Sequence, residues 1–216
     1  MSDGGVRIVE LAIADGPEAW RAAGFDVDGE VCVVGSVRLR FVGREAGRGV
    51  VGWRLSGVEG ADVDGVPVVG FDTLPAEPSS RQGLCGTQPA TGVIGIDHLV
   101  LMTPDLDRTV TALADIGLEP RRRRDAELGG SAVQQVFYRL GEVILEVVGA
   151  PAAHGEAPAS TWGITFTVAD IDATAALLGE GVGRVKDAVQ PGRRITTLRG
   201  RDLGITTAVA FISERP

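Results

Sequence analysis

The sequence predicts an α+β fold made of repeated β-α-β-β-β (βαβββ) modules, and an internal repeat is the main observation behind this prediction. The segment "PDLDRT" at residues 104–109 recurs as "ADIDAT" at residues 169–174, a constant offset of 65 residues. In both places an alternating apolar run precedes the segment and a helical pattern follows it. Three more stretches with period-2 alternation come next in each copy, as expected of half-buried strands. Self-similarity at a fixed period indicates two copies of one structural unit.

Each copy begins with a strand and continues with a helix that an aspartate opens. The strands are predicted in "HLVLMT" and "GITFTV", where apolar residues alternate. Asp105 and Asp170 stand at the heads of the two helices. A short carboxylate accepts hydrogen bonds from the open amides of a first turn, and its charge complements the helix dipole.

The other three strands of each copy are separated by glycine or by charged turns. The first copy contributes "EPRRRR", "SAVQQVFYRL" and "EVILEVV", and the second contributes "GRVKDAV", "RRITTLRG" and "ITTAVAFI". The two modules therefore span residues 93–152 and residues 160–216.

The N-terminal segment, residues 1–71, resembles a third and degenerate copy. It contains the alternating run "VRIVELAIA", a short helix opened by Pro17, and three more alternating stretches. Residues 72–92 are rich in Pro, Ser and Gly, which predicts a linker between this module and the clear repeats.

Composition narrows the range of functions. The 216 residues are 44% hydrophobic, enough for a packed core, and the formal net charge is −8. Because nucleic-acid binding needs a basic face, we expect no nucleic-acid partner. The acidic charge would suit a cationic small molecule, although such charge mostly serves solubility. The N-terminus lacks the features of an export signal and no apolar run is long enough for a membrane span, so a cytoplasmic location without membrane contact is expected.

This pattern resembles the vicinal oxygen chelate superfamily, the glyoxalase, bleomycin resistance protein and dioxygenase family. The resemblance is carried by "GIDHLVLMTPDLDRT", with a histidine in the first strand, and by "LGEVILEVVGAP", with a glutamate in the fourth. It implies that two βαβββ modules pair so that their curled sheets enclose one small-molecule cavity. It also implies a divalent metal held by residues from the first and fourth strands of both modules.

Alternation across the strands assigns residues to the cavity. His98, Val100 and Met102 are expected to face it, while Leu99 and Leu101 lie under the helix. In the fourth strand, Glu146 is a carboxylate within an apolar run, which is costly to bury unless it is paired or bound to a cation. The remaining residues predicted to line the cavity are Gln134, Tyr138, Thr165 and Thr167.

His98 and Glu146 supply half of the metal site that the resemblance implies. The position that matches His98 in the second module is Gly163. The position that matches Glu146 is Phe211 or Val209, depending on which turns are aligned. None of these three side chains binds a metal.

A third ligand would have to come from the N-terminal module. Aligning "VELAIA" with "DHLVLM" puts Glu10 opposite His98, which would give one imidazole and two carboxylates. The ion would be one divalent metal, with Zn, Ni, Mn, Fe and Mg left open, and no general base is identified.

Three functions remain open at this point. The first is a metal-dependent isomerase, lyase or dioxygenase that acts on an oxygenated metabolite, with the ion as Lewis acid. The second is a metal-free protein that binds or sequesters a small molecule or an antibiotic; the missing ligands favour it, and His98 would then be satisfied by Glu146 or by backbone. The third is assembly with another chain, for instance as a homodimer, because such modules pair and three is an odd number.

Overall fold

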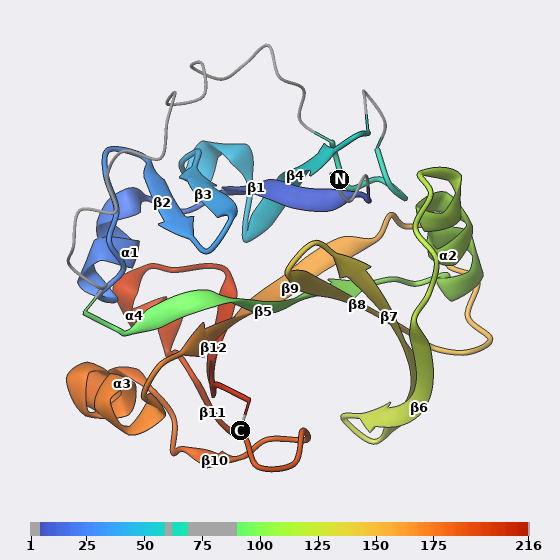
Figure 1. Cartoon of the computed structure of the whole chain (residues 1–216). Helices are drawn as coiled ribbons and strands as arrows, with labels where there is room; N and C mark the ends of the chain where they lie inside the picture. Colours follow the sequence, from blue (N-terminus) through green and yellow to red (C-terminus); the bar gives the residue numbers. More distant parts are fainter. Residues whose placement is uncertain (1–4, 59–61, 69–89, 216) are drawn as a thin grey trace.

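The computed structural model describes residues 5–58, 62–68 and 90–215, which form two stacked β-sheets (Figure 1). The larger sheet has eight strands in the order β10-β11-β12-β9-β5-β8-β7-β6, and the smaller has four in the order β2-β3-β1-β4. Most of the predicted linker, at residues 72–89, lies outside the described residues. None of the described helices is long and apolar enough to cross a membrane.

The eight-stranded sheet is built by the two repeated modules, and it is curled (Figure 1). The middle module comprises β5 (Val93–Met102), α2 (Leu106–Asp115), β6 (Arg122–Leu128), β7 (Ser131–Leu140) and β8 (Val143–Gly149). The C-terminal module comprises β9 (Ser160–Val168), α3 (Ile171–Leu178), β10 (Lys186–Asp187), β11 (Arg194–Thr197) and β12 (Ala208–Ser213), with a 3₁₀ turn at Gly179–Gly181 and the short helix α4 (Gly200–Leu203). In each module the first strand runs parallel to the fourth, and β5 pairs with β9 in antiparallel orientation to join the modules. The predicted βαβββ plan of these two segments matches this order of elements.

The two predicted helix caps are present. The Asp105 side chain accepts from the Arg108 amide at 3.0 Å. Asp170 accepts from the amides of Asp172 and Ala173 at 2.9 and 3.0 Å. The internal repeat seen in the sequence is therefore largely a repeat of this capping motif.

The N-terminal unit has the predicted βαβββ succession of elements but pairs its strands differently from the other two modules. It contains β1 (Arg7–Ile13), α1 (Pro17–Ala22), β2 (Val31–Val34), β3 (Val37–Phe41), a 3₁₀ turn (Arg44–Ala46) and β4 (Val50–Ser56). Strand β4 does not extend the β1-β3-β2 ladder but pairs antiparallel with the other side of β1, as β9 does with β5. The chain crosses the end of β1 to reach this side, where the Ala14 amide donates to the Gly49 carbonyl at 2.8 Å.

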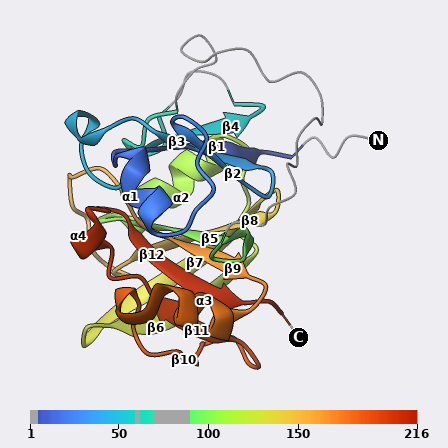
Figure 2. The same cartoon turned by 90° about the vertical axis from the view of Figure 1, so that its left-hand side faces the viewer.

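The smaller sheet packs on the convex face of the larger one (Figures 1 and 2). Aromatic rings fill part of the contact: Phe25 lies 5.0 Å from Phe166 between centroids, and Trp20 lies 6.1 Å from Phe166. Asp15 is fully buried there and accepts hydrogen bonds from the Trp20 indole and from the hydroxyls of Thr206 and Thr207. This packing occupies the outer face of the eight-stranded sheet, so the candidate site has to lie on its inner, concave face.

Candidate functional site

Strand register defines the inner face of the middle module. His98 stands opposite Thr165 on β9 and Ile144 on β8, and Val100 stands opposite Glu146. Residues paired across neighbouring strands share a face of the sheet, so His98, Thr165, Val100 and Glu146 all lie on the inner face. Leu99 is fully buried on the opposite side.

An apolar patch covers one end of this inner face. Val100 and Val148 are buried and pack together with Val133, and Met102 and Ala126 lie against them. This cluster is separate from the main core. It places Val100 and Met102 on the predicted cavity side.

Two residues predicted to line the cavity point the other way. Tyr138 is 1% exposed and belongs to the main core, and burial raises the pKa of its phenol to about 12. Gln134 bonds to Arg123 and Asp125 on the outer face. The predicted parity was wrong because the tight β7–β8 turn fixes a register in which Phe137, and not Tyr138, stands opposite Glu146.

Gln135 and Phe137 are two of the β7 residues that do reach the inner face. The Gln135 amide donates to Glu146 at 2.5 Å, and its oxygen accepts from the Arg124 Nε at 2.8 Å. The Arg124 guanidinium also lies over the Phe137 ring, 5.8 Å from its centroid. Burial raises the pKa of Glu146, while the nearby His98, Arg124 and Gln135 oppose this shift.

His98 is held by its neighbour Asp97. The ring Nδ1 lies 2.8 Å from Asp97 Oδ2, and the other carboxylate oxygen accepts from Arg193 Nη1 at 2.5 Å. Arg193 is 3% exposed and also donates through Nε to the Ser213 carbonyl at 2.7 Å. Burial alone would raise the pKa of Asp97, but the hydrogen bonds with His98 and Arg193 lower it below its ordinary value. A carboxylate at Nδ1 leaves Nε2 as the ring atom that can meet a ligand.

Sequence reasoning missed Asp97 because strict alternation puts it on the outer face. The β5–β9 register shifts between Ile96 and His98, which indicates a bulge at Asp97. A bulge re-aims side chains and brings Asp97 beside His98. The signal in the sequence was a charged residue at a position that alternation assigned to the apolar side.

The C-terminal module has no ligands at the matching positions. Gly163 pairs with Ala208, and Thr165 pairs with Ala210, just as His98 pairs with Ile144 and Val100 with Glu146. With Gly163 equivalent to His98, the equivalent of Glu146 is therefore Ala210. The sequence alignment with Phe211 or Val209 was wrong, because both side chains are buried in the main core.

Glu10 lies in the other sheet, on β1. Its carboxylate is 1% exposed and forms ion pairs with Arg40 at 3.0 Å, Arg38 at 3.4 Å and Arg54 at 3.6 Å. The structure therefore does not support Glu10 as a partner of His98. In the described part of the chain, no three His, Cys, Asp or Glu side chains come together in a way that could hold a metal. His98 and Glu146 fit half of a metal site and not a complete one.

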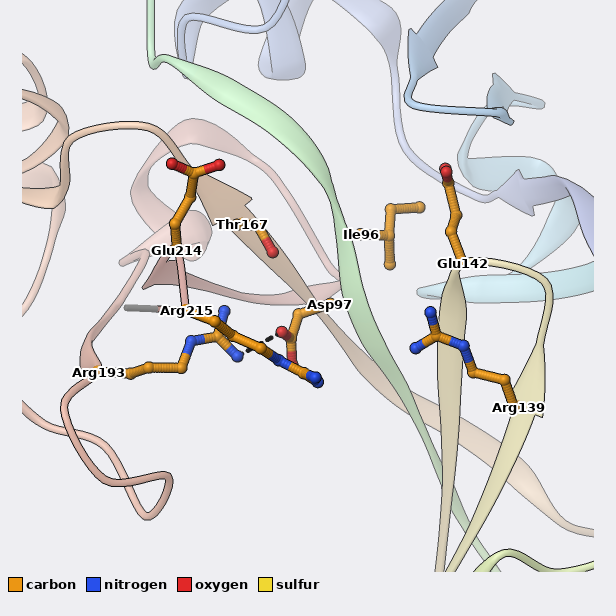
Figure 3. A pocket seen from close by; sticks show the side chains of 8 residues that line it. All are labelled: Ile96, Asp97, Arg139, Glu142, Thr167, Arg193, Glu214 and Arg215. Carbon is orange, nitrogen blue, oxygen red and sulfur yellow. Dashed lines mark hydrogen bonds and ion pairs between the residues drawn. The ribbon is translucent and has the colours of Figure 1, made fainter.

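A pocket of about 370 Å³ opens beside Asp97 (Figure 3). Thr167, one of the predicted lining residues, contributes to it together with Arg139 and Arg193. The inner face therefore combines an apolar patch, the His98–Glu146 pair and a charged pocket.

These features define a class of protein in which two βαβββ modules pair edge to edge and form a concave inner face with apolar and polar side chains. Residues 95–200 match the model of the Glyoxalase/Bleomycin resistance protein/Dioxygenase superfamily. The chain thus carries a domain of this superfamily, and the family expected from the sequence is confirmed.

The fold was also compared with solved structures. A mutant of 4-hydroxymandelate synthase from Streptomyces coelicolor is 14% identical, with a TM-score of 0.60 over 97% of this chain and 93% of that one. A xylose isomerase-like TIM barrel/4-hydroxyphenylpyruvate dioxygenase fusion protein is also 14% identical, with a TM-score of 0.56 over 99% of this chain and 49% of that one. Methylmalonyl-CoA epimerase from Mycobacterium tuberculosis is 15% identical, with a TM-score of 0.46 over 63% of this chain and 95% of that one. No curated protein sequence matches the chain. At these identities the likeness shows the fold alone.

Proposed function

We propose that the chain binds a small oxygenated molecule on the inner face of the eight-stranded sheet, at His98 and Glu146, without a resident metal ion. The observation that carries this proposal is the pair Gly163 and Ala210, which stand where the C-terminal module would supply its ligands. A metal with only two protein ligands depends on water or the bound molecule for its remaining positions.

The two polar side chains suit direct hydrogen bonding to a ligand. Asp97 fixes the His98 ring through Nδ1, so Nε2 is presented in one orientation. Glu146 is oriented by Gln135. Because burial raises its pKa, Glu146 keeps its proton to higher pH than an exposed glutamate and can then donate to a ligand oxygen.

The apolar patch gives the ligand a second point of contact. Val100, Val133 and Val148 are buried side by side next to Glu146, and Met102 lies at their edge. Small-molecule sites usually combine such a surface with a few convergent polar groups. We expect the hydrocarbon part of the ligand to lie on this patch and its oxygens to face His98 and Glu146.

A second candidate function is a metal-dependent isomerase, lyase or dioxygenase, and one observation favours it. The Asp97–His98 hydrogen bond is the arrangement that commonly orients metal-ligating histidines. In this candidate, His98 and Glu146 would bind the ion and the ligand would have to complete its coordination. Assembly of the chain into a homodimer stays a prediction.

The test is a screen of small oxygenated compounds by ligand-observed NMR on chelator-treated protein. We expect to find compounds that bind the wild-type chain and no longer bind the His98→Ala and Glu146→Leu variants. His154→Ala is the matched control, because His154 is 72% exposed and lies beside Asp105, away from the inner face. Binding that both inner-face variants leave unchanged would contradict the proposal.

A further inference from the structure

The pocket beside Asp97 is lined by charged side chains from both modules (Figure 3). Arg139 comes from β7, Arg193 precedes β11 and Arg215 follows β12. Three carboxylates line the same pocket: Asp97, Glu142 and Glu214. Its volume of about 370 Å³ is in the range of small-molecule sites.

Two of the three carboxylates are already engaged. Asp97 is shared between Arg193 and His98, at 2.5 and 2.8 Å. Glu142 accepts from the backbone amide of Ser36 at 2.6 Å. Asp97 and Glu142 are thus committed to groups of the protein itself, and Glu214 is the third carboxylate of the pocket.

The donors of the pocket are less engaged. Within the described residues, Arg139 and Arg215 form no side-chain hydrogen bond or ion pair, and Figure 3 shows both guanidinium groups directed into the pocket. Arg193 uses Nε and Nη1, which leaves Nη2 for a ligand. The Thr167 hydroxyl also lines the pocket. The pocket therefore offers hydrogen-bond donors that the described part of the protein leaves unused, while its three arginines and three carboxylates balance in formal charge.

Arg139 is placed at a fixed distance from His98. Arg139 pairs with Ile144, and Ile144 pairs with His98, so the three residues form one row across β7, β8 and β5 on the inner face. With neighbouring strands 4.7–4.9 Å apart, the Cα atoms of Arg139 and His98 lie roughly 10 Å apart. A molecule of a few carbon atoms can contact both side chains at once.

We infer that this pocket binds a carboxylate group of the ligand, with Arg139 as the main contact and Arg215, Arg193 and Thr167 as further donors. This inference rests on the proposed function for the position of the rest of the ligand, whose oxygen would face His98 and Glu146. A planar guanidinium matches a carboxylate with two parallel hydrogen bonds. Within this pocket a carboxylate, with one negative charge, fits better than a phosphate dianion, because Glu142 and Glu214 stand close and would repel additional charge.

The test compares glutarate, which has one carboxylate for this pocket and a second for the His98–Glu146 end, with glutaramide, its uncharged diamide. Binding is measured by isothermal titration calorimetry on the whole chain. We expect glutarate to bind at least about tenfold more tightly, since the charge-assisted contact is lost in the amide. Arg139→Gln should lower the affinity for glutarate about tenfold and leave the affinity for glutaramide unchanged. Arg201→Gln, at an exposed position on α4, is the matched control and should change neither.

Equal binding of the two compounds, or glutarate binding that Arg139→Gln leaves intact, would overturn the carboxylate site. The fold of the variant is checked by its circular dichroism and Tm. If the variant unfolds, Arg139→Lys replaces it: a point charge without the planar fork should retain only part of the affinity, and full retention counts against the assignment.

The failure of this inference and the failure of the proposed function give different results. Glutarate binding that depends on Arg139 but not on His98 or Glu146 would support the carboxylate pocket and contradict the ligand position in the proposed function. Binding of uncharged oxygenated compounds that depends on His98 and Glu146, with no preference for glutarate, would support the proposed function and contradict the carboxylate pocket.

Discussion

The middle and C-terminal modules have the same succession of elements and differ most on their inner faces. Both begin with a strand, continue through an Asp-capped helix, and return with a fourth strand parallel to the first. The middle module carries His98 and Glu146 where the C-terminal module carries Gly163 and Ala210. The fold is therefore maintained by caps and outer-face packing, and the inner face is free to differ in chemistry.

The modules are nevertheless not independent of each other at the site. Asp97 of the middle module holds His98, and Arg193 of the C-terminal module holds Asp97. The C-terminal module, which has Gly163 and Ala210 at the matching positions, therefore helps to orient His98 of the middle module. Single substitutions in each module, followed by stability measurements, test this division of roles.

The largest effect is expected from Asp97→Asn, which leaves the buried Arg193 guanidinium without its counter-charge. Removing one partner of a buried ion pair costs about 3–5 kcal/mol of the free energy of unfolding. Urea denaturation measures this loss. Asp172→Asn is the control, because it breaks an ion pair with Arg194 whose side chains are 65% and 46% exposed, and it should have little effect. Similar losses for the two variants would show that the Asp97–Arg193 pair does not join the modules.

A smaller effect is expected from Gly163→Ala in the C-terminal module. A Cβ at this position would lie 2.5 Å from the Ala208 carbonyl oxygen, so the strands must shift to admit it. Overpacking of this kind costs about 1–3 kcal/mol. Gly95→Ala on β5 is the matched control, since its Cβ would meet nothing within 4 Å. Equal stability of the two variants would mean that Gly163 is not needed for close strand packing.

The smallest effect is a change in pH dependence with Glu146→Gln. Burial raises the pKa of Glu146, so the folded protein binds this proton more tightly than the unfolded chain does. The stability that the proton contributes is complete below the ordinary pKa and is lost as the pH rises through the folded pKa. The Tm of the variant should therefore rise relative to wild type as the pH increases from the ordinary pKa of glutamate through the higher folded pKa.

The control for this pH series is Glu127→Gln, at an exposed position of the edge strand β6. Its Tm difference from wild type should not follow that of Glu146→Gln. A constant difference for Glu146→Gln would contradict the burial of an ionisable carboxyl on the inner face.

The fold could be predicted from the sequence because its signals are local. The caps at Asp105 and Asp170 recur at one offset, and apolar alternation marks the strands around them. The strand pairing of the N-terminal unit could not be predicted in this way. The side of β1 on which β4 pairs depends on tertiary packing and not on the sequence pattern of β4 itself.

The site could be predicted only as far as alternation holds. It placed His98, Val100 and Glu146 on the inner face, but it failed at Asp97, where a bulge interrupts the period. It also failed at Tyr138, because the β7–β8 turn sets the register. The role of Arg193 could not be predicted from the sequence, because its contact with Asp97 joins residues 96 positions apart.

Metal content of the purified protein tests the central claim most directly. We predict less than one Zn, Ni, Mn, Fe or Mg ion per chain by inductively coupled plasma mass spectrometry, and no change of Tm when these ions are added to chelator-treated protein. One tightly bound ion per chain that His98→Ala and Glu146→Leu both remove would contradict the account, because His98 and Glu146 would then suffice without ligands from the C-terminal module.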